Sequence, residues 1–360
     1  MKRYVFLLWL CCSTSASFAQ ITITSTSMPV AGDTLRHCSA DLSLAVIPLT
    51  DSGANMSWDY SALVPINQVL DSFLTPIQLN PAYILSIPSS DVGQRSNLPI
   101  SGLPLPVSIT DVYTFYKVQA TPNSYSAVTM AANISGLPLS FAYGDPDEKY
   151  FFPLAFHNHD SSTFLLNMTV ATLGTIIQSG YRLTTVDGWG TIVTPYYTSP
   201  VNCIRVRSEI HEIDSINSTL AGAPFSFPRN TVEYKWLVAG DHYPALFVTT
   251  NNAGLGSEQV TDVQYRDHYR PDVPYLGVNK ATNTTITEIK AYPNPASNGT
   301  ITFDIPSDWR NYKIEIFDIQ SKLLSTYHNT RTLEIQSLSK GQYMARVTSG
   351  SSFAYVRIVR

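Results

Sequence analysis

VNCIRVRSEIHEI, residues 201–213, alternates apolar and polar side chains along most of its length. One face of an extended chain would carry Ile204, Val206 and Ile210, and the other would carry Arg205, Arg207 and Glu209. Successive side chains of a β-strand point to opposite faces, so a period of two is typical of a strand in a sheet. The stretch therefore predicts a β-strand rather than a helix.

The same alternation recurs on both sides of this strand. Residues 109–120 alternate, and residues 230–239 place Val232, Tyr234, Trp236 and Val238 on one face. Between residues 181 and 195, the dipeptide Asp187-Gly188 predicts the tight turn of a hairpin, where glycine supplies a positive φ. Six prolines between residues 76 and 106 exclude a long helix or central strands there. The sequence predicts an all-β, mainly antiparallel protein with a large N-terminal sheet or sandwich body.

Composition and charge narrow the class of protein. Only 14% of the 360 residues are charged and 11% are aromatic, which suits half-buried β-sheets. Residues 20–288 contain 12 basic and 22 acidic residues, a net charge of −10, whereas residues 290–360 contain nine basic and five acidic residues, a net charge of +4. An acidic body repels phosphate backbones, so nucleic acid is not expected as a partner.

The first residues resemble a secretory signal. Lys2 and Arg3 precede a short apolar run at residues 4–12, and small residues lead to Ala19. We expect cleavage between Ala19 and Gln20, which makes residues 1–19 a signal peptide. Residues 20–360 contain no other stretch apolar enough to span a membrane, so no transmembrane segment is expected in the mature chain.

Two cysteines, Cys38 and Cys203, remain after removal of the signal peptide. In an exported protein such a pair can form one disulfide, which would close a long loop. Two free thiols are the alternative, and the sequence does not decide between them.

The character of the chain changes near its C-terminal end. Residues 268–289, with Pro271 and Pro274, have little apolar content and are predicted to be a linker between a body of residues 20–267 and a domain of residues 290–360. About seven short alternating segments follow, which predict a small Ig-like β-sandwich. This domain opens on the stiff turn Tyr292-Pro293-Asn294-Pro295.

The C-terminal domain resembles the type A sorting domain of the type IX secretion system of Bacteroidetes. The resemblance is carried by the Tyr292–Pro295 turn, the strand at residues 314–318, the turn at residues 338–343 with Gly341 and Tyr343, and the ending at residues 356–360. Ser321 departs from the glycine that is usual before the lysine found here as Lys322. The resemblance implies export across the outer membrane, recognition by the secretion machinery, removal by a sorting peptidase and attachment to surface lipopolysaccharide. The body more loosely resembles a group of Bacteroidetes secreted proteins with no assigned activity, through residues 55–60, 150–154, 187–191, 203–206 and 234–236.

Two groups of side chains could bind a metal. His157 and His159 would project from the same face of a strand, as two zinc ligands must, with a third ligand from His211 or Glu212. Asp145, Asp147 and Glu148 offer the oxygen ligands that calcium prefers. The alternatives are a polar loop and a charged turn, and no cofactor is expected.

Known catalytic motifs are missing from the sequence. It has no His-Glu-x-x-His, no Gly-x-Ser-x-Gly and no glycine-rich phosphate loop. We therefore expect no catalytic residues, and predict a non-catalytic binding or structural protein that contacts an extracellular ligand. The alternatives are a secreted hydrolase without a recognisable motif and a carrier of an apolar ligand. Among the aromatic residues, Trp236 is predicted to be in the core and Trp189, at the predicted turn, to be exposed.

Overall fold

The computed structural model describes residues 21–97, 108–170, 174–217, 224–251, 258–275, 289–318, 323–349 and 352–360. Nearly all elements in these ranges are β-strands, which confirms the predicted fold class. None of the helices there has the length and apolarity needed to cross a membrane. The predicted cleavage site at Ala19 and Gln20 lies outside the described residues, as does the predicted departure at Ser321.

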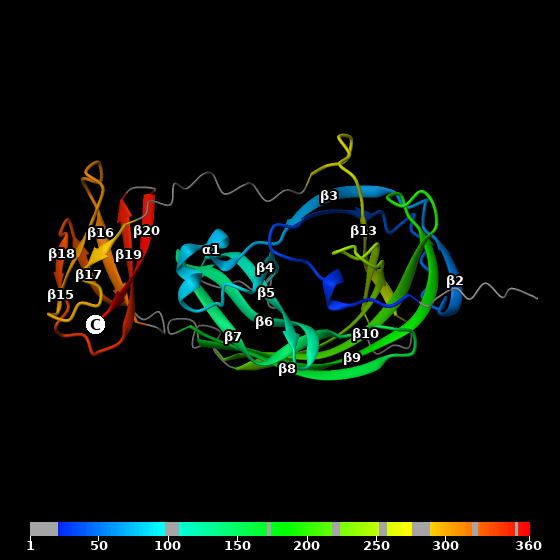
Figure 1. Cartoon of the computed structure of the whole chain (residues 1–360), viewed down its shortest axis with the longest axis horizontal. Helices are drawn as coiled ribbons and strands as arrows, with labels where there is room; N and C mark the ends of the chain where they lie inside the picture. The colour runs from blue at the N-terminus through cyan, green and yellow to red at the C-terminus, as the bar shows by residue number, and fades with distance from the viewer. Residues whose placement is uncertain are drawn as a thin grey trace, which may run out of the picture.

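The body contains one large sheet, shown with its strands labelled in Figure 1. Its strands are β1 (Thr34–Ala40), β2 (Gly53–Asp59), β3 (Pro65–Ser72), β4 (Val92–Arg95), β5 (Ile109–Ala120), β6 (Asn123–Ile134), β7 (Leu137–Phe151), β8 (His159–Val170), β9 (Gly174–Val193), β10 (Val201–Asn217), β11 (Phe225–Leu237), β12 (Leu246–Asn251) and β13 (Gln259–Arg266). Twelve of the strands follow in the order β3-β1-β13-β12-β11-β10-β9-β8-β7-β6-β5-β4, and β2 pairs with β9.

The two ends of this sheet meet. Leu74, just after β3, forms an antiparallel bridge with Gly93 of β4 through two hydrogen bonds of 3.0 and 2.8 Å. Because sheets twist, a sheet with this many strands curls, and here it curls until its first and last strands touch (Figure 1). The sheet therefore has an enclosed face and an outer face.

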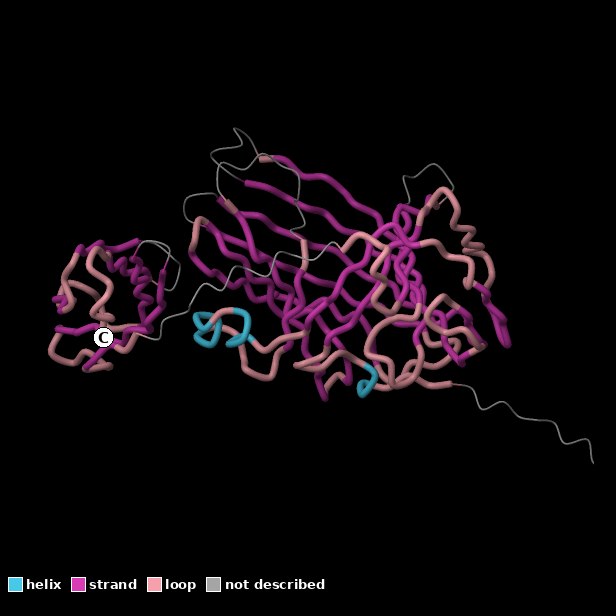
Figure 2. The backbone as a smooth tube through the Cα atoms, turned by 90° about the horizontal axis from the view of Figure 1, so that it is seen from above, coloured by secondary structure: helices cyan, strands magenta, loops and turns pink. Residues whose placement is uncertain are grey.

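Short helical segments lie beside the strands. They are η1 (Ser25–Ser27), α1 (Pro76–Leu79) and η2 (Pro81–Leu85), and Figure 2 shows them at the margin of the strand framework. Pro76 and Pro81 each occupy the first position of a helix, where a missing N–H costs nothing. The described part of the proline-rich stretch, residues 76–97, thus contains short helices and the four-residue strand β4, and it contains no long helix.

Strand β10 is buried on both faces at its centre. Ile204 and Val206 lie in one hydrophobic cluster, while Cys203 lies in another together with Trp58 and Trp236. The second cluster forms because residues 41–64, which include β2, cover the outer face of the sheet. Arg205, 1% exposed, consequently lies in the interior, where its guanidinium donates to both carboxylate oxygens of Asp187 at 2.8 and 2.7 Å.

The predicted hairpin turn at Asp187-Gly188 is wrong. Strand β9 continues through it, and the register with β10 shifts between Arg205 and Val206, so that Asp187 is an extra residue in a β-bulge. A bulge re-aims a side chain, and here the Asp187 carboxylate accepts hydrogen bonds from Arg205. Trp189, predicted to be exposed, is half-buried against the cluster of Ile204 and Val206.

Strand β2 pairs in parallel with the part of β9 that extends beyond β8. Gly190 makes this approach possible, because a Cβ atom at residue 190 would lie 1.9 Å from the carbonyl oxygen of Met56. The position of β2 in turn places Trp58 at an edge-to-face distance of 5.9 Å from Trp236, between ring centroids.

We expect Gly190→Ala to lower the free energy of unfolding by about 1–3 kcal/mol, because β2 must move away and loosen the packing around Trp58. Urea denaturation followed by tryptophan fluorescence measures this change. Gly144→Ala is the matched control in β7, because its new Cβ atom would have no neighbour nearer than 3.6 Å. Equal stabilities of the two variants would contradict the close approach at Gly190.

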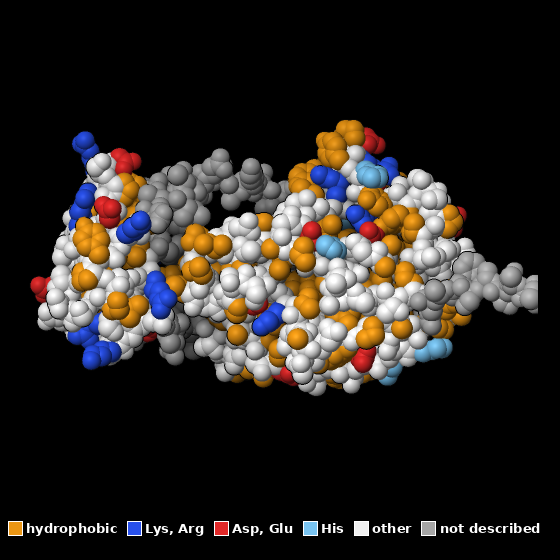
Figure 3. Space-filling view, viewed as in Figure 1, with side chains coloured by type: hydrophobic (Ala, Val, Ile, Leu, Met, Phe, Trp, Pro, Cys, Tyr) orange, Lys and Arg blue, Asp and Glu red, His pale blue; other side chains and the backbone are white. Residues whose placement is uncertain are grey.

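The C-terminal domain contains two facing sheets. Their seven strands are β14 (Ala291–Tyr292), β15 (Thr300–Phe303), β16 (Lys313–Phe317), β17 (Leu323–His328), β18 (Thr332–Glu334), β19 (Gln342–Ser349) and β20 (Ser352–Val359). The orders are β14-β15-β18 and β17-β16-β19-β20, and a separate apolar core that includes Phe303, Ile314 and Ile316 fills the space between them. Basic side chains are spread over this domain in Figure 3, in keeping with its positive charge.

Candidate functional site

The curled sheet lines a partly open cavity of about 670 Å³, called the central cavity here. Its lining comes from strands far apart in the sheet order, for example Asp71 of β3, Tyr116 of β5, Lys149 of β7, Lys235 of β11 and Gln264 of β13. The N-terminal segment also contributes Ile23 and Met28, since Ile23 forms a bridge with Leu154. Cavities of this size are typical of sites for small molecules.

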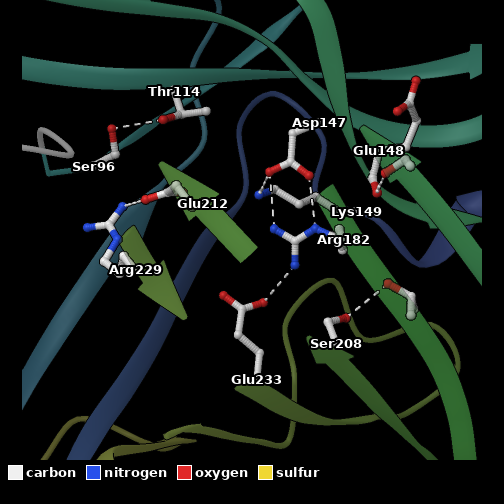
Figure 4. Close-up of polar contacts among 12 residues, drawn as sticks. Ser96, Thr114, Asp147, Glu148, Lys149, Arg182, Ser208, Glu212, Arg229 and Glu233 are labelled. Carbon is white, nitrogen blue, oxygen red and sulfur yellow. Dashed lines mark hydrogen bonds and ion pairs between the residues drawn. The ribbon is translucent and has the colours of Figure 1, made fainter. Parts of the chain in front are cut away.

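Five charged residues form a connected group at one wall of the central cavity, and Figure 4 shows four of them, Asp147, Lys149, Arg182 and Glu233. This charge cluster consists of Asp147, Lys149, Arg182, Glu233 and Lys235. Arg182, whose side chain is 3% exposed, donates to both Asp147 carboxylate oxygens at 2.9 and 3.1 Å and to Glu233 at 3.3 Å. Lys149 donates to Asp147, and Lys235 donates to Glu233 at 2.8 Å. Each carboxylate thus binds Arg182 and one lysine.

The pKa values within the charge cluster follow from these contacts. Burial alone would raise the pKa of Glu233, but Lys235 and Arg182 outweigh it and lower that pKa to about 2. For Asp147 the same competition, with Arg182 and Lys149 as the cations, also lowers the pKa. Burial and the nearby Arg182 lower the pKa of Lys149 despite Asp147. Both carboxylates are therefore ionised at neutral pH.

Aromatic rings surround the charge cluster. Tyr116 and Tyr125 stack at 5.1 Å between centroids, and Lys235 Nζ lies 4.4 Å from the centre of the Phe247 ring. Burial raises the pKa of Tyr116 to about 12, so the phenol stays neutral. This wall combines charged groups with flat apolar surfaces.

The opposite wall holds acidic and imidazole groups. His37, 6% exposed, stacks on Tyr243 at 5.4 Å, and its Nδ1 atom lies 3.4 Å from Asp71. Asp241 binds Arg266 at 2.6 Å. Each acid on this wall has a basic or imidazole partner of its own.

A further buried carboxyl, Asp214 on β10, differs from these. It is 0% exposed, its nearest cation is Arg229 at 3.6 Å, and neither of its oxygens accepts a hydrogen bond from a described residue. Burial raises the pKa of Asp214 to about 6. Because the folded state favours the protonated form, the stabilisation is full below pH 4 and is lost as the pH rises through 6.

We expect Asp214→Asn to remove this loss of stability at higher pH, because the amide cannot ionise. Between pH 4 and pH 7 the difference in stability between variant and native protein should change by roughly 2–3 kcal/mol in favour of the variant. Urea denaturation at several pH values measures it. Asp272→Asn, at an exposed position, is the control and should show no such change. A constant difference across this range would contradict the buried ionisable state.

The structure does not gather the predicted metal ligands. His157 and His159 are exposed, and His159 Nδ1 is paired with the Thr185 hydroxyl at 2.7 Å. His211 stacks on Tyr181, and Glu212 binds Arg229. Among the described residues, no group of three or more potential ligands comes together.

The three predicted calcium ligands do not form one group. Asp147 belongs to the charge cluster, whereas Asp145 and Glu148 line one surface pocket, where Asp145 accepts a hydrogen bond from Thr163 at 2.6 Å. Burial, together with the nearby charges of Asp145 and Asp147, raises the pKa of Glu148.

Cys38 and Cys203 are free thiols in the structure. They lie on β1 and β10, with three strands between them at a spacing of about 4.8 Å per strand, whereas a disulfide needs Cα atoms within about 7 Å. Burial, with a smaller contribution from Asp267, raises the pKa of Cys38 to about 12, and burial also raises the pKa of Cys203. Both thiols act as small core side chains.

In the C-terminal domain, the sorting-motif residues meet at the last strand. The Asn294 side chain donates to the carbonyl of Arg357 at 2.6 Å and accepts from the N–H of Val359 at 2.9 Å. Gly341 and Arg360 exchange two backbone hydrogen bonds of 3.0 and 2.9 Å. The Tyr343 hydroxyl donates to the carbonyl of Ser339 at 2.7 Å. Tyr292, which ends β14, is exposed beside this turn.

Fold and sites together define a chain with a cavity-containing β-sheet body and a small C-terminal β-sandwich. Residues 290–359 match the family of the secretion system C-terminal sorting domain. The chain is therefore a secreted or cell-surface protein, exported across the outer membrane by the type IX system. Comparison with curated proteins and with solved structures gave no match.

The sequence analysis missed the charge cluster. Glu233 and Lys235 stand on the polar face of an alternating strand, a pattern that normally indicates a solvated surface. Only the closure of the sheet turns that face inward. The one available signal was the pairing of opposite charges two residues apart, which is too common to indicate a site.

Proposed function

We propose that the exported body is a non-catalytic binding protein that holds a small molecule in its central cavity at the cell surface. The observation that carries the proposal is the partly open 670 Å³ cavity of the curled sheet, which aromatic and charged side chains line. A scaffold of paired strands fixes these side chains, so little ordering is needed on binding. Of the alternatives predicted from the sequence, this proposal is nearest to the carrier of an apolar ligand, but one wall of the cavity is charged.

Hydrolysis is less well supported. A glycosidase-like mechanism needs two facing carboxylates, one of them able to donate a proton near neutral pH. In the central cavity, Glu233 binds Arg182 and Lys235, and Asp241 binds Arg266. Glu233, whose pKa is lowered to about 2, stays ionised and cannot act as a general acid.

We divide the two functions, ligand binding and export, between the two predicted domains. We assign ligand binding to residues 20–267 and export to residues 290–360. Within the predicted linker, Pro274 accepts a backbone hydrogen bond from Gln68, and Gln68 Nε2 donates to the carbonyl of Val273 at 2.7 Å, while residues 276–288 lie outside the described residues. Removal by a sorting peptidase and attachment to surface lipopolysaccharide remain inferences from the resemblance.

Native mass spectrometry of the protein purified from a secreting host tests the proposed function. We expect a non-covalent small-molecule adduct that leaves on denaturation, and a rise in melting temperature when the extracted molecule is added back. Absence of any adduct, together with no stabilisation by a broad set of small molecules, would contradict it.

We also expect the body to contain no stoichiometric zinc. Catalytic zinc needs three protein ligands, and His157 and His159 have no third partner among the described residues. Metal analysis and melting curves with and without chelator test this. Changing both histidines to alanine should alter stability by no more than about 0.5 kcal/mol. One tightly bound zinc per chain, lost in that variant, would instead favour the hydrolase.

A further inference from the structure

The charge cluster carries one more positive charge than negative charge. Lys149, Arg182 and Lys235 are cations, and Asp147 and Glu233 are carboxylates. Uncompensated charge is costly inside a protein. The surplus is therefore stabilised most by an anion that enters the cavity.

The other charged groups of the central cavity lie outside the two strands that carry the lysines. Asp241 binds Arg266, and Arg95 lies 3.4 Å from Asp111 at the exposed rim. Asp71 lies on β3 beside His37, whose imidazole balances the carboxylate only when it is protonated. The surplus thus belongs to the wall formed by β7, β9 and β11.

The surplus charge can be reached through the two lysines. Their side chains are 23% and 18% exposed and line the cavity, whereas Arg182 is 3% exposed behind them. An ammonium has three N–H donors. Lys149 gives one to Asp147, and Lys235 gives one to Glu233 and one to the Tyr150 hydroxyl, which leaves donor capacity on each lysine for a further acceptor placed between them.

Apolar surface adjoins these lysines. Tyr116, Tyr125, Tyr150 and Phe247 line the same cavity, and the ring of Phe247 lies against Lys235. A ligand that places an anionic head at the lysines would therefore lay an aromatic or aliphatic body against flat rings.

From this geometry we propose that the central cavity selects an amphipathic organic monoanion, with its acidic head on Lys149 and Lys235 and its apolar body against the tyrosine and phenylalanine rings. This inference rests on the proposed binding function and specifies its ligand class. A neutral molecule of the same shape gains the ring contacts and leaves the surplus charge unpaired.

Two fluorescent probes with the same skeleton test the selection. 8-Anilinonaphthalene-1-sulfonate is a monoanion, and N-phenyl-1-naphthylamine lacks its sulfonate. We expect the full-length mature protein to bind one anionic probe per chain, about tenfold more tightly than the neutral probe. In Lys235→Met the preference should fall to nearly onefold, while the affinity for the neutral probe stays unchanged.

The variants keep the fold because Arg182 still binds both carboxylates. Lys149→Met, which leaves Asp147 on Arg182, is the second variant and should give the same loss. Lys117→Met, at an exposed position on β5, removes the same charge away from the cavity and should leave the preference intact. Circular dichroism checks folding in each case.

Equal affinity of the native protein for both probes would overturn the charge selection and leave the binding function standing. So would a preference that survives in both lysine variants, because the sulfonate would then bind elsewhere. Failure of either probe to bind, while the secreted protein still carries a small-molecule adduct, would also overturn the proposed ligand class.

Discussion

Removing residues 290–360 should abolish delivery of the chain to the cell surface and leave the body folded. The deleted segment is the part that matches the sorting-domain family. Among the described residues, the strands of the body sheet pair only with one another, and the apolar clusters around Trp236 and Ile204 contain no residue beyond 275. The domain adds a small cluster, in which Leu137 and Leu139 pack on Phe317, so the main packing of the body stays intact without it. Surface labelling of whole cells with an antibody to the body measures delivery, and circular dichroism of the purified truncated chain measures folding.

Full-length Gly144→Ala, a mild change in the body, is the control for expression and should be delivered normally. A truncated chain that still reaches the surface would contradict the role of residues 290–360. A truncated chain that is retained and unfolded would instead contradict the boundary between the two domains.

Replacing Arg182 by methionine should lower the free energy of unfolding by about 3–5 kcal/mol. Arg182 is the only residue of the charge cluster that binds both carboxylates, and its loss leaves Asp147 and Glu233 buried with one lysine each. Removing one partner from a buried ion pair leaves an uncompensated charge, which is why the cost exceeds that of a surface pair. Urea denaturation at pH 7 measures the change.

Arg95→Met is the matched control, because Arg95 and Asp111 are 40% and 41% exposed and water screens their charges. Its cost should stay within about 1 kcal/mol. Adding Asp147→Leu to Arg182→Met should recover part of the stability, since it removes one of the stranded charges. Similar losses of unfolding free energy in Arg182→Met and Arg95→Met would contradict a special contribution of buried charge pairing at Arg182.

The strands could be predicted largely from alternation. Residues 109–120 and 230–237 form the strands expected of them, and Trp236 is fully buried with Val232 and Tyr234 on the predicted face. The mistake at Asp187-Gly188 arose because the dipeptide that favours a tight turn also suits a bulge. The choice between them depends on Arg205, a partner on the next strand, which local sequence does not reveal.

The cavity could not be predicted for a different reason. Alternation tells which residues share a face but not whether that face meets water or another part of the same sheet. Alternation places Glu233 and Lys235 on the face of β11 opposite Trp236, and the bridge between Leu74 and Gly93 turns that face toward the central cavity. This bridge joins two irregular, proline-flanked segments that carry no periodic signal.

The order of strands around the sheet also determines when the body can finish folding. Strand β1, which begins at Thr34, pairs with β13, and Cys38 faces Tyr265 across that pairing. Contacts between residues so distant in sequence form slowly, because a long loop must close first. The chain cannot complete its largest sheet until residue 266 is available, so a nascent chain on the ribosome remains without its closing strand. This delay keeps the body from completing its fold until nearly all of its residues have been made.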